Sequence, residues 1–186
     1  MESELSPKAH NSIRIIVAHN AEQVAHALAV RSIVFVEDEG LRFSHAHDPN
    51  DYVCSHIVIY DGEEPIGSAR VRWFKDFAKI ERTAFRKAHR DPRVLKATAQ
   101  FIFAHAAQKG YDRILTLAEE HYARLWMKLL GFRKLHEEPI TRPHQTNSFY
   151  MLEKVVSVPE DAVTPETPAR IMIRPEGRWD IPLSFG

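Results

Sequence analysis

The residues from Lys79 to Gly110 combine types that can bind phosphate and carry charge. A predicted strand bearing Glu81 and Arg82 ends at Phe85, and a basic turn, Arg86–Arg90, follows it and leads into a predicted helix. The unpaired N–H groups at a helix N-terminus carry partial positive charge and attract phosphates. The sequence therefore predicts an anion-binding junction here, suited to a diphosphate.

Two further groups of residues have types that bind ligands. Arg31 and Arg70 can each grip a carboxylate with two parallel hydrogen bonds, or they can be paired or solvated surface charges. His45, His47 and Asp48 have metal-ligand types, but two histidines at i and i+2 lack a firm third ligand. We therefore expect no metal site in this stretch.

Hydrophobic periodicity places these residues on an alternating series of strands and helices. Asn20 and Gln23 indicate an N-cap for the first helix, which Gly40 ends, and Asp91 with Pro92 starts a second helix. A third helix, 119–130, is followed by Gly131. The predicted strands are Ile13–Val17, Ser55–Tyr60, Ile66–Trp73, Phe77–Phe85, Arg113–Leu117, Phe132–Leu135 and Ser148–Val155.

The order of these elements is strand, helix, three strands, helix, strand, helix and two strands. Three meandering strands between helices indicate a mixed α+β layout rather than a doubly wound sheet. Between the first helix and the meander, 41–52 is predicted as a long polar loop, and loops of that length are often functional. Within 77–85, simple alternation predicts Ile80, Arg82 and Ala84 on one face and Glu81, Thr83 and Phe85 on the other.

Bulk composition limits the class of protein. The chain has 186 residues, 44% apolar and 27% charged, with 25 basic and 25 acidic side chains, which argues against a dedicated nucleic-acid binder. No apolar run approaches the roughly 20 residues that span a bilayer, and the N-terminus lacks the form of a signal peptide. Because Cys54 is the single cysteine, the chain cannot form an internal disulfide, and the cytoplasm is the default location. We expect Cys54 itself to be a small buried residue.

The character of the chain changes after Val155. Three prolines among acidic and small residues indicate an extended linker, and 171–173 is a candidate for a short added strand. The tail from Trp179 to Phe185 is apolar and is expected to dock on its own domain or on a partner, for which a homodimer is one option. We therefore expect a domain over 12–155 and a C-terminal extension over 156–186.

The segment 13–155 resembles a Gcn5-related N-acetyltransferase (GNAT) domain in its order of elements. Its local motifs are Arg31-Ser-Ile-Val-Phe35-Val-Glu37, then Asp48 and Asp51, then Pro65-Ile66-Gly67-x-x-Arg70, Glu81-Arg82-Thr83-Ala84-Phe85, and Ala123-x-x-x-Met127-x-x-x-Gly131-Phe132. The first four are also similar to acyl-homoserine lactone synthases, which share the fold, although those enzymes space the Glu and Arg further apart.

The resemblance implies a mixed, mostly antiparallel sheet flanked by helices, and it assigns roles to particular positions. The acyl donor, acetyl-CoA or another acyl-CoA, would contact Thr83, Ala84, Phe85, Arg90, Arg93, Val94, Leu95 and Lys96. The acceptor would contact Arg31, Phe35, Asp48, Asp51 and Arg70. The chain departs from the family at Met127, where a Tyr proton donor is usual, and at Arg93 and Leu95, where glycines are usual.

Transfer of an acyl group to an amine requires a base, because a free alkyl amine has a pKa near about 10. Glu81, acting directly or through a water, is the first candidate, and its alternative role is a structural ion pair. His56 is the second, since its ordinary pKa suits neutral pH, and its alternative role is a satisfied core histidine. The resemblance implies that backbone N–H groups after Arg82 stabilise the oxyanion.

Three functions follow as hypotheses. The first is an N-acyltransferase that moves an acyl group, in first place acetyl, from acyl-CoA to a small-molecule amine. The second is an autoinducer-synthase-like or N-acyl amino acid synthase that takes its acyl group from an acyl carrier protein. The third is a catalytically silent GNAT-fold module that binds a ligand or partner. None requires a metal, a nucleic acid or a membrane.

Overall fold

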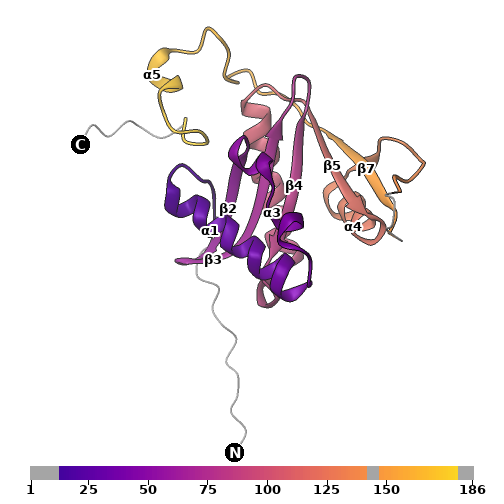
Figure 1. Ribbon diagram of the computed structural model, residues 1–186. Helices are drawn as coiled ribbons and strands as arrows, with labels where there is room; N and C mark the ends of the chain where they lie inside the picture. Colours follow the sequence, from indigo (N-terminus) through magenta and orange to yellow (C-terminus); the bar gives the residue numbers. More distant parts are fainter. Residues whose placement is uncertain (1–12, 142–146, 180–186) are drawn as a thin grey trace, which may run out of the picture.

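The fold is built on one mixed β-sheet with helices on both of its faces (Figure 1). The computed structural model describes residues 13–141 and 147–179. The elements are β1 (Ile13–Val17), α1 (Ala21–Arg31), the π-helix η1 (Ser32–Asp38), α2 (Phe43–Ala46), the 3₁₀ turn η2 (Pro49–Tyr52), β2 (Ser55–Asp61), β3 (Glu64–Trp73), β4 (Ala78–Phe85), the 3₁₀ turn η3 (Lys87–His89), α3 (Pro92–Gln108), β5 (Arg113–Glu119), α4 (Glu120–Leu130), β6 (Arg133–Lys134), β7 (Phe149–Val155) and α5 (Ala169–Met172).

Helix boundaries follow the predicted capping residues. The Asn20 side chain accepts from the N–H of Gln23 at 2.9 Å, and the Gln23 side chain accepts in return from the N–H of His19 at 3.0 Å. Asp91 caps α3 by accepting from the N–H of Arg93 at 2.7 Å. Gly131 ends α4 with φ +71°, a conformation that favours glycine. The predicted caps are therefore confirmed.

The strands lie in the order β1-β2-β3-β4-β5-β7-β6, and every neighbouring pair is antiparallel except β4 with β5. Helix α1 lies across one face of the sheet and α3 lies behind the other, with α4 beside β5 and β7 (Figure 1). The main core, which includes Ile57, Ile80, Ile102, Ile114 and Leu152, forms between the sheet and α3 and α4. The predicted α+β architecture, a mixed and mostly antiparallel sheet flanked by helices, is confirmed. No helix in the described ranges has the length and apolar character to cross a membrane.

The parallel pair β4–β5 is short. Within the described residues it pairs only at Ala78 with Ile114, Lys79 with Leu115 and Ile80 with Thr116. The Thr116 hydroxyl donates to the carbonyl of Ile80 at 3.0 Å, which ties the two strands at the last pair. Beyond it the strands separate, and β5 leans away from β4 (Figure 1). The later half of β4 is thus bonded to β3 on one side and open on the other.

A β-bulge lies in this open half of β4. Arg70 pairs with Glu81 and Ser68 pairs with Ala84, so two residues of β4 oppose one residue of β3. Arg82 takes φ +54°, the only positive value among the described non-glycine residues, and such values are uncommon for a non-glycine residue.

The predicted simple alternation along β4 is therefore wrong after Glu81. The extra residue moves Ala84 to the α1 face, where it packs with Val30 and Val34, while Ile80 faces the main core. Phe85 returns to the main-core side and lies over Gly67, where an added Cβ would come within 2.7 Å of the Phe85 ring. The Gly67 motif residue thus allows close packing of β3 against this ring.

Two other local predictions are corrected. The segment 41–52, predicted as a loop, contains α2 and η2, because Asp48 and Asp51 form a reciprocal capping box around Pro49. The segment 171–173, predicted as a strand, lies at the end of the short helix α5, which follows Pro168. In both cases local hydrogen bonds of a single turn decide the conformation.

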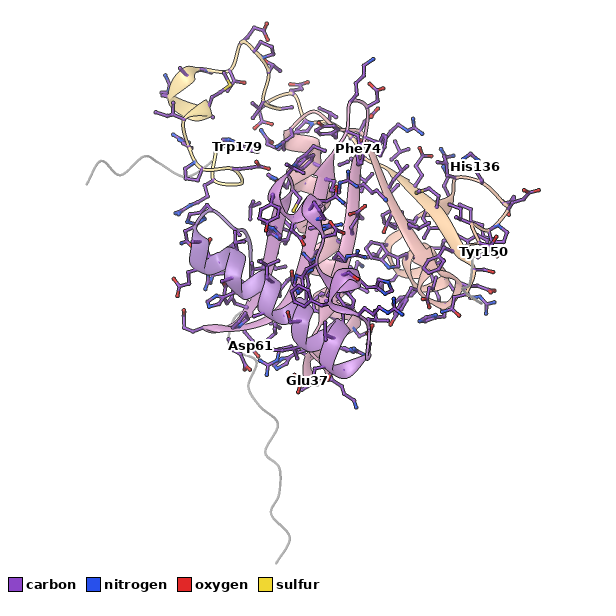
Figure 2. All side chains as sticks on the ribbon, viewed as in Figure 1. Glu37, Asp61, Phe74, His136, Tyr150 and Trp179 are labelled. Carbon is purple, nitrogen blue, oxygen red and sulfur yellow. The ribbon has the colours of Figure 1, made fainter. Side chains whose placement is uncertain are left out.

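The C-terminal segment docks on its own domain. The carboxylate Oε1 of Glu176 accepts from the Ser55 hydroxyl at 2.7 Å and the Lys109 ammonium at 3.0 Å, and lies 3.0 Å from Nε2 of His105. Trp179, labelled in Figure 2, stacks on the His105 ring at 5.5 Å between centroids. The rest of the predicted apolar tail, 180–185, lies outside the described residues.

Candidate active site

A cavity of about 360 Å³ opens where β4 and β5 separate. Strands β3 and β4 and the segment 41–50 line one side of it with charged groups, and β5 and β7 line the other. Four of the predicted site residues lie on its wall, namely Phe35, Asp48, Arg70 and Glu81. The bulge and the strand separation therefore bring distant parts of the sequence to one chamber.

Arg31 stands behind this wall. It ends α1, is fully buried, and donates from Nη1 and Nη2 to the two carboxylate oxygens of Asp51 at 2.6 and 3.0 Å. It also donates to the carbonyl of Ala46. Because the planar guanidinium matches both oxygens of the carboxylate, the pair fixes the end of α1 to the turn η2. Arg31 and Asp51 thus hold the cavity-lining segment in place.

Arg70 is the centre of the charged cluster. It is 2% exposed and donates to three carboxylates: Asp48 at 2.9 Å from both Nη atoms, Asp51 at 2.8 Å, and Glu81 at 3.0 and 2.7 Å. Burial alone would lower the pKa of Arg70, but these hydrogen bonds raise it above its usual value. The guanidinium is therefore permanently charged, and the three carboxylates that neutralise it all belong to the protein.

The carboxylates of the cluster are ionised at neutral pH. The hydrogen bond from Arg70 holds the pKa of Asp48 well below its usual range, against the effect of burial. For Asp51, burial would raise the pKa, but bonds from Arg31, the Asp48 N–H and Arg70 lower it to about 2. The cluster is therefore a fixed ionic frame under physiological conditions.

The predicted acceptor-binding residues do not all line the cavity. Arg31 and Arg70 were expected to grip a carboxylate of the acceptor, but their donors hold carboxylates of the protein itself. Phe35 and Asp48 lie on the cavity wall, whereas Asp51 lies behind it with Arg31. These motif residues thus form the frame of the cavity in this chain.

Glu81, the first candidate base, is surrounded by cations. One oxygen accepts from Arg70, and the other lies 2.8 Å from the Lys79 ammonium and 3.6 Å from Arg72. Burial would raise the pKa of Glu81, but the hydrogen bonds from Lys79 and Arg70 lower it overall. A carboxylate held so strongly in its ionised form is a weak proton acceptor. Its contacts fit the structural ion-pair role.

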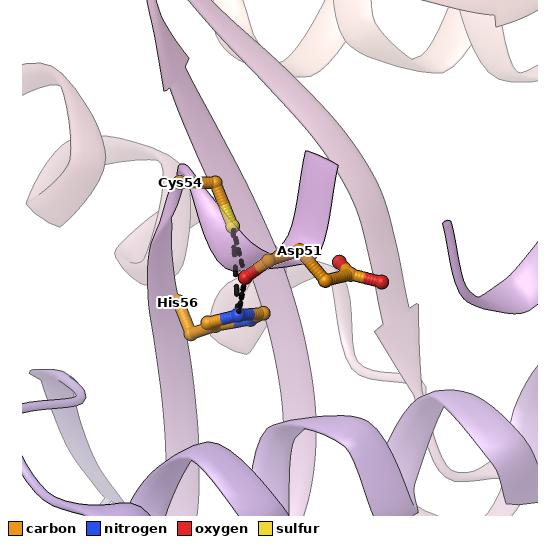
Figure 3. Close-up of side chains that lie close together, drawn as sticks. All are labelled: Asp51, Cys54 and His56. Carbon is orange, nitrogen blue, oxygen red and sulfur yellow. Dashed lines mark hydrogen bonds between the residues drawn. The ribbon is translucent and has the colours of Figure 1, made fainter. Parts of the chain in front are cut away.

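His56, the second candidate, lies inside the sheet on β2 and is 4% exposed. Its Nε2 lies 2.9 Å from the carbonyl of Asp51 and 3.5 Å from the Cys54 thiol (Figure 3). Burial lowers the pKa of His56, so the ring is neutral and its Nε2–H donates to the carbonyl. This contact anchors the turn η2, and His56 does not line the cavity.

The trio in Figure 3 brings together ligand types that metals use, with atoms within 4.8 Å of one another. The donors do not suit a metal, because the Asp51 carboxylate is already held by two guanidinium groups. Burial also raises the pKa of Cys54 to about 11, so its thiol stays protonated and is a poor ligand. Of the loop residues with metal-ligand types, His47 instead contacts the Ser32 hydroxyl at 2.8 Å.

Sequence reasoning missed several residues of the cavity. Lys79, Arg82, Leu117, Glu119 and Phe149 all line it, and three of these lie on β5 and β7. Arg82 reaches Asp48 at 3.1 Å, because the bulge turns its side chain to the same face as Glu81. The prediction of Glu119 as the first residue of the third helix is wrong, because β5 continues beyond Leu117 and Glu119 is its last residue.

The junction from β4 to α3 keeps its basic side chains near the surface. Arg90 donates to the carbonyl of Phe85 at 3.2 Å and to Glu39 at 3.3 Å, while the exposed Arg93 is paired with Asp91. A smaller cavity, of about 210 Å³, lies at this turn and is lined by Arg90 among others. Because Asp91 also holds the N–H of Arg93, a phosphate arriving here would meet side-chain cations more readily than free amides.

The other predicted donor-binding positions are spread over the junction. Thr83, Ala84 and Phe85 lie on the open half of β4, beyond its last pair with β5, where Thr83 and Phe85 are half-buried and Ala84 is buried. Val94 is buried in the main core, and Lys96 is exposed. Leu95 is half-buried and continues the helix through its N–H bond to the carbonyl of Asp91 at 3.0 Å.

Helix α4 carries the departure at Met127, which packs partly buried against the main core. Tyr122 is the nearest phenol on the same helix and is 44% exposed. Burial raises the pKa of Tyr122, and the charges of Glu39 and Glu119 add to that effect. Tyr122 therefore lies within electrostatic range of Glu119, which lines the cavity.

Comparisons with known proteins agree with this fold. The model of the acetyltransferase (GNAT) family matches residues 19–132. The chain belongs to the GNAT acetyltransferase family. An N-acetyltransferase of Bacillus subtilis called YjcF, itself uncharacterized, is 30% identical over 126 residues, which cover 68% of this chain and 89% of YjcF. This GNAT protein is accordingly an enzyme of the acetyltransferase class.

Solved structures show the same fold at lower identity. A crystal structure described as an N-acetyltransferase from Lactobacillus plantarum superposes with a TM-score of 0.71, at 24% identity, over 78% of this chain and 99% of that one. An acyl-CoA N-acyltransferase from Pseudomonas aeruginosa gives a TM-score of 0.67, at 16% identity, over 77% and 100%. These structures show the fold, whereas the family rests on the family model and on YjcF. The finer resemblance to acyl-homoserine lactone synthases stays a prediction.

Proposed function

We propose that this GNAT protein transfers an acyl group from acyl-CoA to the amine of a small molecule, with acetyl as the first candidate for that group. The observation that supports this most is the open half of β4 beside a charged cavity. An extended chain such as the pantetheine arm of coenzyme A can lie along the open edge of β4 and hydrogen-bond to its backbone, as an added strand would. The cavity of about 360 Å³ at the end of that edge then accommodates the acceptor.

The two ends of the donor would meet different parts of the chain. The diphosphate would lie against the basic turn, where Arg90 is the cation best placed, between the Phe85 carbonyl and the Glu39 carboxylate. The thioester would lie at the bulge, where backbone N–H groups after Arg82 stabilise the oxyanion. The reaction needs no metal, and the single cysteine fits a reducing compartment such as the cytoplasm.

A calorimetric titration of the purified protein with acetyl-CoA and then with a long-chain acyl-CoA tests this proposal. We expect saturable binding of acetyl-CoA that weakens in Arg90→Ala, together with release of coenzyme A thiol when a panel of primary amines is added. Arg124→Ala is the matched control, because Arg124 is an exposed arginine paired only with Glu120 on α4. Absence of binding to both donors would overturn the proposal.

The β4–α3 junction also favours a second donor, an acyl carrier protein. Asp91 holds an amide at the start of α3, and Arg93 is 84% exposed, so the surface suits the acidic side chains of a carrier protein. That donor brings a single phosphate and would make an N-acyl amino acid or lactone-type product accessible. Acyl transfer from an acyl carrier protein that exceeds transfer from acyl-CoA at equal concentration would favour this candidate over the first.

A further inference from the structure

Glu119 differs from the other carboxylates of the cavity in its surroundings. It is the last residue of β5 and lines the cavity from the side opposite the ionic frame. Its side chain is 32% exposed, compared with 14% for Glu81 and 20% for Asp48. Glu119 is therefore the carboxylate of this lining that a ligand in the cavity reaches most easily.

The bonding partners of these three carboxylates also set Glu119 apart from Asp48 and Glu81. Asp48 accepts from Arg70 and Arg82, and Glu81 accepts from Arg70 and Lys79, so each is matched with cations of the protein. In Glu119, by contrast, Oε1 accepts from the neutral amide of Asn147 at 3.1 Å. No described lysine or arginine is bonded to it, so its charge is available to a cationic ligand.

The groups around Glu119 are few and mostly exposed. His121 places Nδ1 3.7 Å from Oε2 and has a side chain that is 64% exposed. The charge of Glu119 also acts on Glu39 and Tyr122, whose pKa values are raised by burial and, to a smaller degree, by Glu119. Arg90 lies 3.3 Å from the Glu39 carboxylate and offsets its negative charge. Among these groups the two carboxylates, Glu39 and Glu119, outnumber the one permanent cation, Arg90, which suits an ammonium group.

We infer that Glu119 binds the ammonium of the acceptor and takes its proton. This inference rests on the proposed function, since it names the catalytic base of that reaction. A carboxylate opposite a wall of cations also orients the acceptor, because the ammonium is attracted to β5 and repelled by Lys79 and Arg72 on the other wall.

The step balances as follows. The ammonium gives one proton to the Glu119 carboxylate, and the neutral amine attacks the thioester carbon, forming the C–N bond. The tetrahedral intermediate collapses, the C–S bond breaks, and the nitrogen loses its second proton to the departing thiolate. Glu119 then returns its proton to solvent, so the products are an amide, free coenzyme A thiol and one proton.

Two glutamates next to each other in the chain provide the test and its control. Glu119→Gln removes the base, and Glu120→Gln alters the neighbouring residue, which is exposed and paired with Arg124 on α4. Both variants are assayed for thiol release from acetyl-CoA with ethanolamine, spermidine, glycine and L-lysine, and with hydroxylamine. Hydroxylamine is already unprotonated at neutral pH and needs no base.

We expect Glu119→Gln to lose about 100-fold or more in kcat with the best alkylamine, within the range for removal of a general base. Its rate with hydroxylamine should stay within about threefold of wild type, and Glu120→Gln should match wild type with both nucleophiles. The pH dependence of kcat/KM should also change. The wild-type value should be flat below the pKa of the amine, whereas the value for Glu119→Gln should rise about tenfold per pH unit, because only free amine reacts.

The outcomes separate the two proposals. Alkylamine transfer that is equal in Glu119→Gln and Glu120→Gln overturns the role of Glu119 while leaving the proposed function intact. A parallel loss with hydroxylamine also overturns it, since a purely structural role would affect both nucleophiles. A wild-type protein that acylates hydroxylamine but no alkylamine contradicts a working base. A wild-type protein that releases no thiol with any of them overturns the proposed function and this inference together.

Discussion

Two groups of arginines in this protein lie on either side of the bulge in β4 and are built in different ways. In the ionic frame, Arg31 and Arg70 are 0% and 2% exposed; Arg31 is bonded to both oxygens of one carboxylate, and Arg70 is bonded to three carboxylates. At the β4–α3 junction, Arg90 and Arg93 are 46% and 84% exposed, and each has one carboxylate partner. The first group cannot exchange its partners for a ligand without leaving charges buried, whereas the second group can.

This difference explains why arginines that were all predicted from the sequence to bind ligands have different roles in the structure. A buried guanidinium with three carboxylates fixes the geometry of a cavity, and its removal would leave negative charges uncompensated. An exposed guanidinium with one partner contributes little to stability and is available for a phosphate. Substitutions in the two groups should therefore separate folding from ligand binding.

Arg70→Met should have the largest effect. We expect it to lower the free energy of unfolding by about 3–5 kcal/mol, because Asp48, Asp51 and Glu81 would share a site without their central cation. Urea denaturation followed by circular dichroism measures this. Arg72→Met, two residues along β3 and 27% exposed, is the control and should cost about 1 kcal/mol or less. Equal costs for the two variants would contradict the frame.

Glu176→Gln should have the next largest effect, about 1–3 kcal/mol, because one carboxylate oxygen anchors the C-terminal segment to Ser55, His105 and Lys109. Burial would raise the pKa of Glu176, but these hydrogen bonds lower it to about 2. Since the folded-state pKa lies below that of the unfolded chain, the stabilisation is present at neutral pH. It is lost as the pH falls from about 5 to about 2.

The melting temperatures of wild type and Glu176→Gln should therefore differ at pH 7 and converge in acid. Glu166→Gln is the control, because Glu166 lies on the same C-terminal segment and bonds only within its own turn. If the difference in melting temperature between wild type and Glu176→Gln stays constant down to about pH 2, the charge of Glu176 does not stabilise the docked segment.

Arg90→Ala should weaken acetyl-CoA binding about tenfold, equivalent to about 1.4 kcal/mol, through the loss of one cation at the diphosphate. Its melting temperature should change little, because Arg90 is half-exposed and has a single carboxylate partner. Calorimetric titration with acetyl-CoA provides the dissociation constants. A stability loss comparable with that of Arg70→Met would place Arg90 in the structural group instead.

Arg93→Ala should have the smallest effect, within about 0.5 kcal/mol on stability, because Arg93 is almost fully exposed and its pairing with Asp91 is local. Asp91 still caps α3 through the backbone N–H of residue 93, so helix content should be unchanged. Thermal unfolding and acetyl-CoA titration test both points. A loss of affinity greater than that of Arg90→Ala would identify Arg93 as the main phosphate contact.

Local features of the sequence were sufficient for the main strands and helices and for the family, but not for the short elements α2, η2 and α5. The caps at Asn20 and Asp91, the Gly131 helix end and the order of strands all depend on residues within a few positions of each other, and the structure confirms them. The motif residues from Arg31 to Phe85 also marked the fold in advance. Such signals are readable because each one acts through its own stretch of backbone.

Only the tertiary structure decided what those residues do. The bulge at Arg82 moved Ala84 across the sheet, and the partners of Arg70 come from two different segments, so neither could be derived from alternation along one strand. Glu119 reaches the cavity only because β5 pairs with β4 at three positions and then separates. The sequence by itself determined the main strands and helices, their caps and the family. The tertiary structure decided which charges are buried together and which remain available to a ligand, because that depends on contacts between segments far apart in the chain.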